Sequence, residues 1–176
     1  MPYKHHHRPE KYYLTIPFEE FPKRFGTPHH PSPRHLTVVS WFKSSHFVDL
    51  MGALEHYCAD QSPFDITFGP LEPIGDNFEL TGQMVREGRE RLVALHCGLL
   101  GIVEMFGTLN DYTYAGKRYN PHSSVDGHEL FTVDAPIDVH SVLVVGKYTK
   151  DEHRMNDPDK ELSAGFRLGP KPERAT

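Results

Sequence analysis

Apolar residues recur at every second position in several short stretches of the chain, which is the pattern of strands with one buried face. Residues 11–18 (KYYLTIPF) and 35–43 (HLTVVSWFK) are also rich in the aromatic and β-branched residues that strands favour. Between them, residues 19–34 contain four prolines and are expected to form an irregular loop. Shorter or less regular stretches predict further strands over residues 62–74, 77–85, 129–137, 139–149 and 163–169.

Two longer stretches have their apolar residues at helical spacing. The first runs to Cys58, with Ser44 or Ser45 as the expected N-cap. The second covers residues 87–107, where apolar residues form one stripe and Gly107 is the expected helix stop. The resulting order is two strands, a helix, two strands, a helix and four strands, which favours an α+β fold.

The chain has 176 residues, of which 38% are hydrophobic and 24% charged, as expected for a globular domain. Its formal net charge of −5 argues against a long nucleic-acid duplex held by phosphate neutralisation, although a small phosphate ligand needs only a local positive site. Cys58 and Cys97 fall in the predicted helices, and both are expected to be buried thiols in a reducing compartment, with a structural disulfide as the alternative. Without a targeting segment or a membrane-length apolar run, the protein is expected to be cytoplasmic, with no membrane partner.

Two probable strand starts carry a histidine followed two positions later by a hydroxyl residue. The pairs are His35 with Thr37 and His122 with Ser124, and in a strand both members of a pair leave the same face. A third match falls in the proline-rich loop 19–34 and is discounted. Taken alone, either pair is better explained by a structural histidine that donates to a backbone carbonyl.

Taken together, the two pairs fit the cleavage of a phosphodiester without a metal. That reaction needs a general base for the nucleophile and a general acid for the leaving oxygen, and two imidazoles can divide these roles near neutral pH. The charge that develops on the phosphoryl oxygens needs hydrogen-bond donors, which the two hydroxyls can supply. Two such strands placed next to each other in a sheet would surround one phosphate.

These motifs resemble those of the two-histidine (2H) phosphoesterase superfamily, in its branch of bacterial 2′-5′ RNA ligases and 2′,3′-cyclic phosphodiesterases. The motifs here are HLTV (35–38) and PHSSV (121–125). The likeness extends through YYLTIPF, SPFDITFGPLEPIG and ELFTVDAPIDVHSVLVVGKY and covers about residues 11–169. The resemblance implies a single domain over residues 1–176 with two pseudo-symmetric lobes, each an antiparallel sheet backed by helices, around a central cleft.

The resemblance also implies roles for individual residues. His35 and His122 would be the acid–base pair, and Thr37 and Ser124 would bind the phosphate. Family members typically open a 2′,3′-cyclic phosphate to leave a 2′-phosphate, without a metal or cofactor, and a reverse 2′-5′ RNA ligase activity is a further expectation. The expected ligand is a small cyclic nucleotide or a short RNA end with a cyclic phosphate, bound by a monomer.

Further residues are expected to contact the substrate. The family pattern has a basic residue after its second motif that this chain lacks. Positive charge could come instead from residues that are equally well explained as surface charges: Arg34, Lys117 and Arg118. Tyr119 could stack on a base or anchor its loop, and Phe42 could flank the cleft at the end of the first motif's strand.

Two other functions and one other kind of site stay open at this point. The chain could be a phosphodiesterase that degrades signalling cyclic nucleotides or oligonucleotides, or a nucleotide- or RNA-end-binding module without turnover. Histidines 5–7, with His29 and His30, suggest a loose metal site. No ligand spacing of a closed site supports it, so no functional metal is expected.

Overall fold

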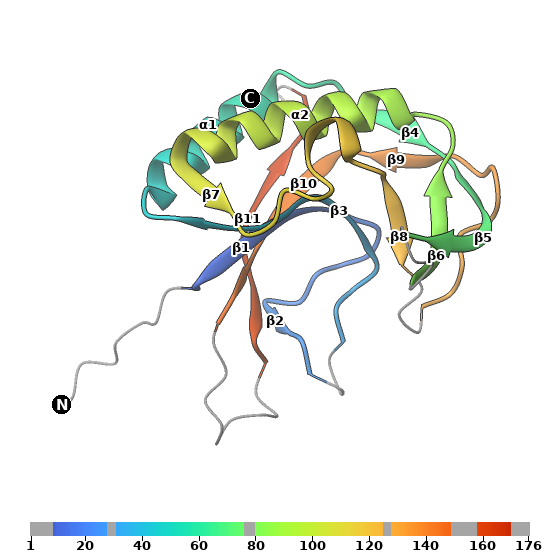
Figure 1. Ribbon diagram of the computed structural model, residues 1–176, viewed down its shortest axis with the longest axis horizontal. Helices are drawn as coiled ribbons and strands as arrows, with labels where there is room; N and C mark the ends of the chain where they lie inside the picture. Colours follow the sequence, from blue (N-terminus) through green and yellow to red (C-terminus); the bar gives the residue numbers. More distant parts are fainter. Residues whose placement is uncertain (1–8, 28–30, 76–79, 125–127, 149–157, 170–176) are drawn as a thin grey trace, which may run out of the picture.

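The computed structural model describes residues 9–27, 31–75, 80–124, 128–148 and 158–169, most of them in helices and three antiparallel sheets (Figure 1). The helices are α1 (Phe47–Ala59), α2 (Arg89–Phe106) and a 3₁₀ turn, η1 (Gly116–Arg118). The strands are β1 (Lys11–Pro17), β2 (Arg24–Phe25), β3 (His35–Ser44), β4 (Phe64–Ile66), β5 (Phe68–Ile74), β6 (Leu80–Val85), β7 (Gly107–Leu109), β8 (His122–Ser124), β9 (Ile137–Val139), β10 (Ser141–Lys147) and β11 (Lys160–Arg167). Within these ranges, neither long helix is apolar over a length that would cross a membrane.

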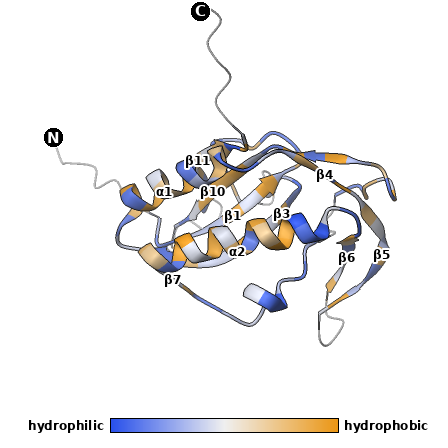
Figure 2. Cartoon of the chain, turned by 90° about the horizontal axis from the view of Figure 1, so that it is seen from above, coloured by the Kyte–Doolittle hydropathy of each residue, from blue (hydrophilic) through white to orange (hydrophobic). Residues whose placement is uncertain are grey.

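The largest sheet has six strands in the order β2-β11-β10-β1-β3-β7, and α1 and α2 lie side by side across one of its faces (Figures 1 and 2). Apolar residues of both helices, such as Leu54 and Leu99, meet those of the sheet in one core. The opposite face is covered by the segment between β1 and β3, where Phe21 and Phe25 pack with Tyr13. β1 is therefore buried on both faces, which explains its nearly continuous apolar sequence.

A three-stranded sheet, β5-β6-β8, and a two-stranded sheet, β4-β9, stand at one end of the large sheet (Figure 1). β3 carries the first histidine motif and β8 carries the second, so the two motifs belong to different sheets. They line a common cleft from two sheets, as the expected pair of lobes around a central cleft implies, and the predicted α+β class with antiparallel sheets is confirmed.

Most of the predicted elements are present. The stretches 11–18, 35–43, 139–149 and 163–169 contain β1, β3, β10 and most of β11, while 62–74 is divided into β4 and β5, and 77–85 contains β6, with 77–79 outside the described residues. The N-cap of α1 is His46 rather than a serine. The hydroxyl of Ser44 is used elsewhere, because it donates to the carbonyl of Phe106 at the end of α2.

Gly107 ends α2 as expected, but not through a left-handed conformation. Its backbone is extended, and it begins β7, where it pairs with Ser44 of β3. A Cβ at this position would lie 2.2 Å from the carbonyl oxygen of Lys43. Glycine is therefore required by the close approach of β3 to the end of the helix.

The strand predicted over residues 129–137 is absent except at Ile137, the first residue of β9. The buried side chain of Gln83 on β6 binds the backbone of this segment. The N–H of Phe131 donates to Gln83 Oε1 at 2.7 Å, and Gln83 Nε2 donates to the carbonyls of Phe131 at 3.0 Å and Gly69 at 2.9 Å. Because a side chain satisfies its polar groups, the segment needs no neighbouring strand there.

Both cysteines are free. Cys58 is buried as expected, and burial raises its pKa to about 12, so the thiol is protonated and unreactive at neutral pH. The expectation that Cys97 is buried is wrong. Cys97 is exposed because it falls outside the buried stripe of α2.

The contacts of Gln83 can be tested by Gln83→Leu, which removes all three hydrogen bonds and takes these partners from the half-buried backbone of Phe131 and the buried carbonyl of Gly69. We expect the free energy of unfolding to fall by about 3 kcal/mol, measured by urea denaturation. Gln61→Leu is the matched control, because Gln61 makes a single 3.4 Å hydrogen bond to the carbonyl of Tyr57. An equal loss of stability in the two variants would show that the three hydrogen bonds of Gln83 do not stabilise the fold in this way.

Candidate active site

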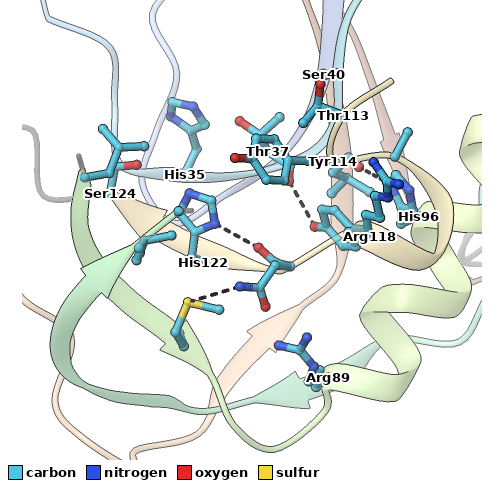
Figure 3. A pocket seen from close by; sticks show the side chains of 18 of the residues that line it. His35, Thr37, Ser40, Arg89, His96, Thr113, Tyr114, Arg118, His122 and Ser124 are labelled. Atoms are coloured by element: carbon cyan, nitrogen blue, oxygen red, sulfur yellow. Dashed lines mark hydrogen bonds between the residues drawn. The ribbon is translucent and has the colours of Figure 1, made fainter. Parts of the chain in front are cut away.

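A cleft of about 1240 Å³ opens between β3 and the β5-β6-β8 sheet. Figure 3 shows the imidazoles of His35 and His122 in this cleft, with Thr37 on one side of them and Ser124 on the other. Two motifs that are far apart in the sequence therefore meet in one cavity. Eight of the nine residues expected from the sequence line it: Arg34, His35, Thr37, Lys117, Arg118, Tyr119, His122 and Ser124.

The first motif lies on an irregular strand. His35 begins β3, and the exposed Thr37 follows it with one buried residue between them. The pairing of β3 with β1 then shifts register twice, between Thr37 and Val39 and between Val39 and Phe42. The shifts keep Val39 in the core and place Ser40 on the exposed side that lines the cleft.

The second motif is held by β6. His122 pairs with Met84, and Ser124 pairs with Gly82. His122 and Ser124 therefore face the cleft, whereas Ser123 between them is buried on the other face. A Cβ at Gly82 would lie 2.5 Å from the carbonyl oxygen of Ser123, so the glycine lets β8 come this close.

The two imidazoles are oriented by the same local device. Nδ1 of His35 lies 2.6 Å from the carbonyl oxygen of Pro33, and Nδ1 of His122 lies 2.8 Å from that of Asn120. In each case the carbonyl belongs to the residue two positions before the histidine. A carbonyl oxygen only accepts, so Nδ1 carries a proton in both rings and Nε2 is the atom that exchanges protons.

The backbone of the first motif is tied to the loop that precedes the second. The hydroxyl of Tyr119 donates to the carbonyl of Thr37 at 2.9 Å. His96, on α2, donates from Nδ1 to the carbonyl of Val38 at 2.6 Å and accepts at Nε2 from the N–H of Gly116 at 2.8 Å. β7 pairs only with the last three residues of β3, so these side chains supply donors along the part of the strand that β7 does not reach.

His96 must be neutral to make both of these hydrogen bonds, because Nε2 cannot carry a proton and accept one from Gly116. The side chain is 2% exposed, and its ring stacks on that of Tyr119 with the centroids 4.0 Å apart. Burial lowers the pKa of His96, and the hydrogen bond to the Val38 carbonyl opposes this with a smaller effect. Burial also raises the pKa of Tyr119, which keeps its hydroxyl a donor.

A second set of contacts joins the segment before the first motif to the segment after the second. The guanidinium of Arg34 donates to the carbonyl of Glu129 at 3.0 Å and lies 4.2 Å from the ring centroid of Phe131. Nε2 of His128 lies 3.0 Å from the carbonyl oxygen of Ser32. Nε of Arg34 is buried and has no hydrogen-bond partner in the described part of the chain, so it is not open to a ligand.

Phe42 is the one expected site residue that does not line the cleft, and the expectation that it contacts a substrate is wrong. Its ring is fully buried in the core, and the residue pairs with Tyr12 on one side and Leu109 on the other. Simple alternation along β3 already places Phe42 on the core face with Leu36, opposite to His35 and Thr37, because the effects of the two register shifts on side-chain direction cancel by the time the strand reaches Phe42.

Sequence reasoning missed two residues of the site, Arg89 and His96. Arg89 is the first residue of α2 and lines the cleft. A cation in the first turn of a helix opposes the helix dipole, and this was the available signal. His96 lies in the buried stripe of α2, and its partners Val38 and Gly116 come from distant segments, so nothing local marks it.

No group of three or more His, Cys, Asp or Glu side chains is placed to hold a metal within the ranges that the structure describes. The histidines at 5–7, 29 and 30, which suggested a loose metal site, lie outside those ranges. The expectation that no functional metal binds there stays a prediction.

Comparisons with known proteins place the fold. No family model matches the sequence, and no curated protein matches it. Solved structures do match: a phosphoesterase (TM-score 0.60, 14% identity, 92% of this chain and 99% of that one), E. coli LigT with NADP+ (0.58, 13%, 93% and 99%) and TT0787 of Thermus thermophilus (0.56, 13%, 92% and 100%). At these identities the likeness shows that the chain has the fold of these proteins.

The neutral state of His96 predicts how stability depends on pH. In the unfolded chain this histidine titrates near 6.5, above its lowered pKa in the folded protein, so the unfolded state takes up the proton first as the pH falls. The contribution of His96 to stability is complete above pH 6.5 and is lost progressively below it. We expect His96→Gln, which keeps a donor and an acceptor but does not titrate, to lose less stability between pH 7 and pH 5 than the wild type.

Urea denaturation at each pH measures this difference, with His56→Gln as the control because the His56 side chain is 85% exposed. His96→Phe keeps the stacking on Tyr119 but removes both hydrogen bonds, and we expect it to cost about 3 kcal/mol at pH 7. Identical acid sensitivity in the wild type and His96→Gln would show that His96 does not carry the effect.

Proposed function

We propose that this chain, which has the fold of LigT-type phosphoesterases, is a metal-independent cyclic phosphodiesterase that opens 2′,3′-cyclic phosphates of nucleotides or RNA ends to 2′-phosphates. The observation that carries the proposal is the matched pair of imidazoles in one cleft. Each has Nδ1 held by the carbonyl two residues earlier and a hydroxyl residue two positions later: His35 with Thr37, and His122 with Ser124.

The proposed reaction is an in-line displacement at phosphorus. Water attacks opposite the ribose 3′ oxygen, and the neutral imidazole takes a proton from it at Nε2 as the new P–O bond forms. The protonated imidazole gives its proton to the 3′ oxygen as the P–O3′ bond breaks. The products are a 2′-phosphate and a free 3′-hydroxyl, and the two imidazoles have exchanged protonation states, which solvent restores.

The remaining groups of the cleft would stabilise the charge on the phosphoryl oxygens. The hydroxyls of Thr37 and Ser124 would supply donors from the two motif strands, and Arg34 would add a positive charge. Among the solved structures with this fold, E. coli LigT has been crystallised with NADP+, 3′-AMP, ATP and phosphate. These ligands support a nucleotide phosphate as the group that the cleft of this chain binds.

Removal of either imidazole tests the proposal directly. With a 2′,3′-cyclic mononucleotide in EDTA, we expect the wild type to form the 2′-phosphate. We expect His35→Ala and His122→Ala to lower kcat/KM by about 10³-fold, because each removes one proton-transfer group. Thr37→Ala and Ser124→Ala should each cost about 10²-fold through the lost phosphate donor. Chromatography of the products separates 2′- from 3′-phosphates.

The matched control is His140→Ala, a histidine with a half-exposed side chain that does not line the cleft. Full turnover in either active-site variant would overturn the paired-histidine mechanism. Binding of the 2′-phosphate without any turnover of the cyclic nucleotide would identify a binding module instead.

The pH profile is a separate test of the division of roles. One imidazole must start neutral and the other protonated, so kcat/KM should fall at both low and high pH and give a bell-shaped profile. Steady-state rates from pH 5 to pH 9 measure it. A flat profile would exclude two titrating proton-transfer groups. The reverse ligase activity, the monomeric state and the cytoplasmic location stay predictions.

A further inference from the structure

The cleft holds an excess of positive charge in a protein that is acidic overall. The formal net charge of the chain is −5, yet four cations line the cleft against a single carboxylate, Glu72, among the residues that the structure describes. Arg34 is engaged with Glu129 and Phe131. The other three cations have no ion-pair partner in the described part of the chain: Arg89, Lys117 and Arg118.

These three cations come from two elements that pack together. Arg89 begins α2, and Lys117 and Arg118 belong to η1. The positive charge of Arg89 acts on the hydroxyl of Tyr119, the residue that follows η1, and partly offsets the rise in its pKa. Figure 3 shows Arg89 and Arg118 apart from the two imidazoles and also apart from each other, at the start of α2 and on the η1 loop. The cations therefore line the cleft at separate points beyond the two motifs.

The positions of the cations are fixed by the fold. η1 is held to α2 and β3 by the hydrogen bond from Gly116 to His96 and by the bond from Tyr119 to Thr37. Arg89 stands in the first turn of α2, which Figure 2 shows as hydrophilic beside β6, and there its charge opposes the helix dipole. A fixed cation without a partner, in an unfavourable position for its helix, is well explained by an anion supplied by a ligand.

The volume of the cleft and the residues of its β5-β6 wall indicate what kind of anion the three cations would bind. At about 1240 Å³ the cleft is larger than the pockets of roughly 300–1,000 Å³ that hold one small ligand. Its β5-β6 wall carries the apolar residues Ile74, Leu80 and Met84 beside the one carboxylate, Glu72. An apolar surface suits the bases and sugars of a nucleotide, and cations without an ion-pair partner suit its phosphates.

We propose that Arg89, Lys117 and Arg118 form a second anion subsite, which binds the internucleotide phosphates of an oligonucleotide whose reacting phosphate lies between His35 and His122. This inference rests on the proposed function and narrows its substrate from a mononucleotide to a chain with at least one further phosphate. A linear RNA end and a cyclic oligonucleotide share this chemistry.

The test compares substrates of different length, of which the first two carry the same 2′,3′-cyclic phosphate and the third carries only internucleotide phosphates. The probes are a 2′,3′-cyclic mononucleotide, a trinucleotide with a 2′,3′-cyclic end and a cyclic dinucleotide. We expect kcat/KM to be at least about tenfold higher for one of the longer probes, mainly through a lower KM. Its dependence on salt should be steeper by about 0.7 in log–log slope for each extra phosphate that is neutralised.

Variants that lack these charges test whether the three cations cause the preference for a longer probe. In Arg89→Gln/Lys117→Gln/Arg118→Gln we expect the ratio of kcat/KM between the long and short probes to fall toward one. Lys117→Gln alone should lower this ratio in part, whereas Lys43→Gln, an exposed lysine of β3 outside the cleft, should leave it unchanged. Calorimetric binding of a trinucleotide 2′-phosphate and a mononucleotide 2′-phosphate repeats the comparison without turnover.

The possible results distinguish a failure of the proposed subsite from a failure of the proposed reaction. Turnover of the mononucleotide with no preference for either longer probe, in both kinetics and binding, would overturn the subsite and leave the proposed function standing. A binding preference for the trinucleotide that disappears in the triple variant, without turnover of any probe, would support the subsite and reject the proposed function. A preference that survives in the triple variant would place the second phosphate elsewhere and overturn the assignment.

Discussion

The structure of the cleft depends on two backbone carbonyls of β3, those of Thr37 and Val38. Both lie where the strand departs from regular pairing with β1, and both accept from side chains of other elements, Tyr119 and His96. Those two side chains stack on each other, and His96 also holds the loop that leads to the second motif. The irregular part of β3, which carries the first motif, is thus attached to the loop that leads to the second motif.

This arrangement explains how an acidic protein can present a cationic cleft. The loop that contains η1 would keep Lys117 and Arg118 in water if it were free to move. The neutral ring of His96 and the hydroxyl of Tyr119 attach it to β3, so that its charges line the cavity. Net charge describes the whole surface, whereas recognition of a phosphate depends on the few charges that the backbone holds within reach of it.

Local patterns were sufficient for much of the fold and for the centre of the site. Alternation and β-branched residues located β1 and β3, helical spacing located α1 and α2, and the two histidine pairs met in one cleft as expected. The failures have a common cause, which is a partner from far along the chain. Gln83 binds the backbone around Phe131, so that a predicted strand does not form there. His96 looked like any buried residue because its function is to join two segments that the sequence separates.

The orientation of each imidazole by a carbonyl two residues earlier has a consequence for how such a site can change over time. The groups that fix the tautomer and the orientation of each imidazole ring belong to two short peptides, Pro33 to Thr37 and Asn120 to Ser124. The rest of the molecule has only to bring these peptides face to face. The fold itself tolerates wide variation in sequence, because solved structures that share it have as little as 12% identity to this chain. A designer could exploit the same separation by transplanting both peptides into an unrelated scaffold with a suitable groove.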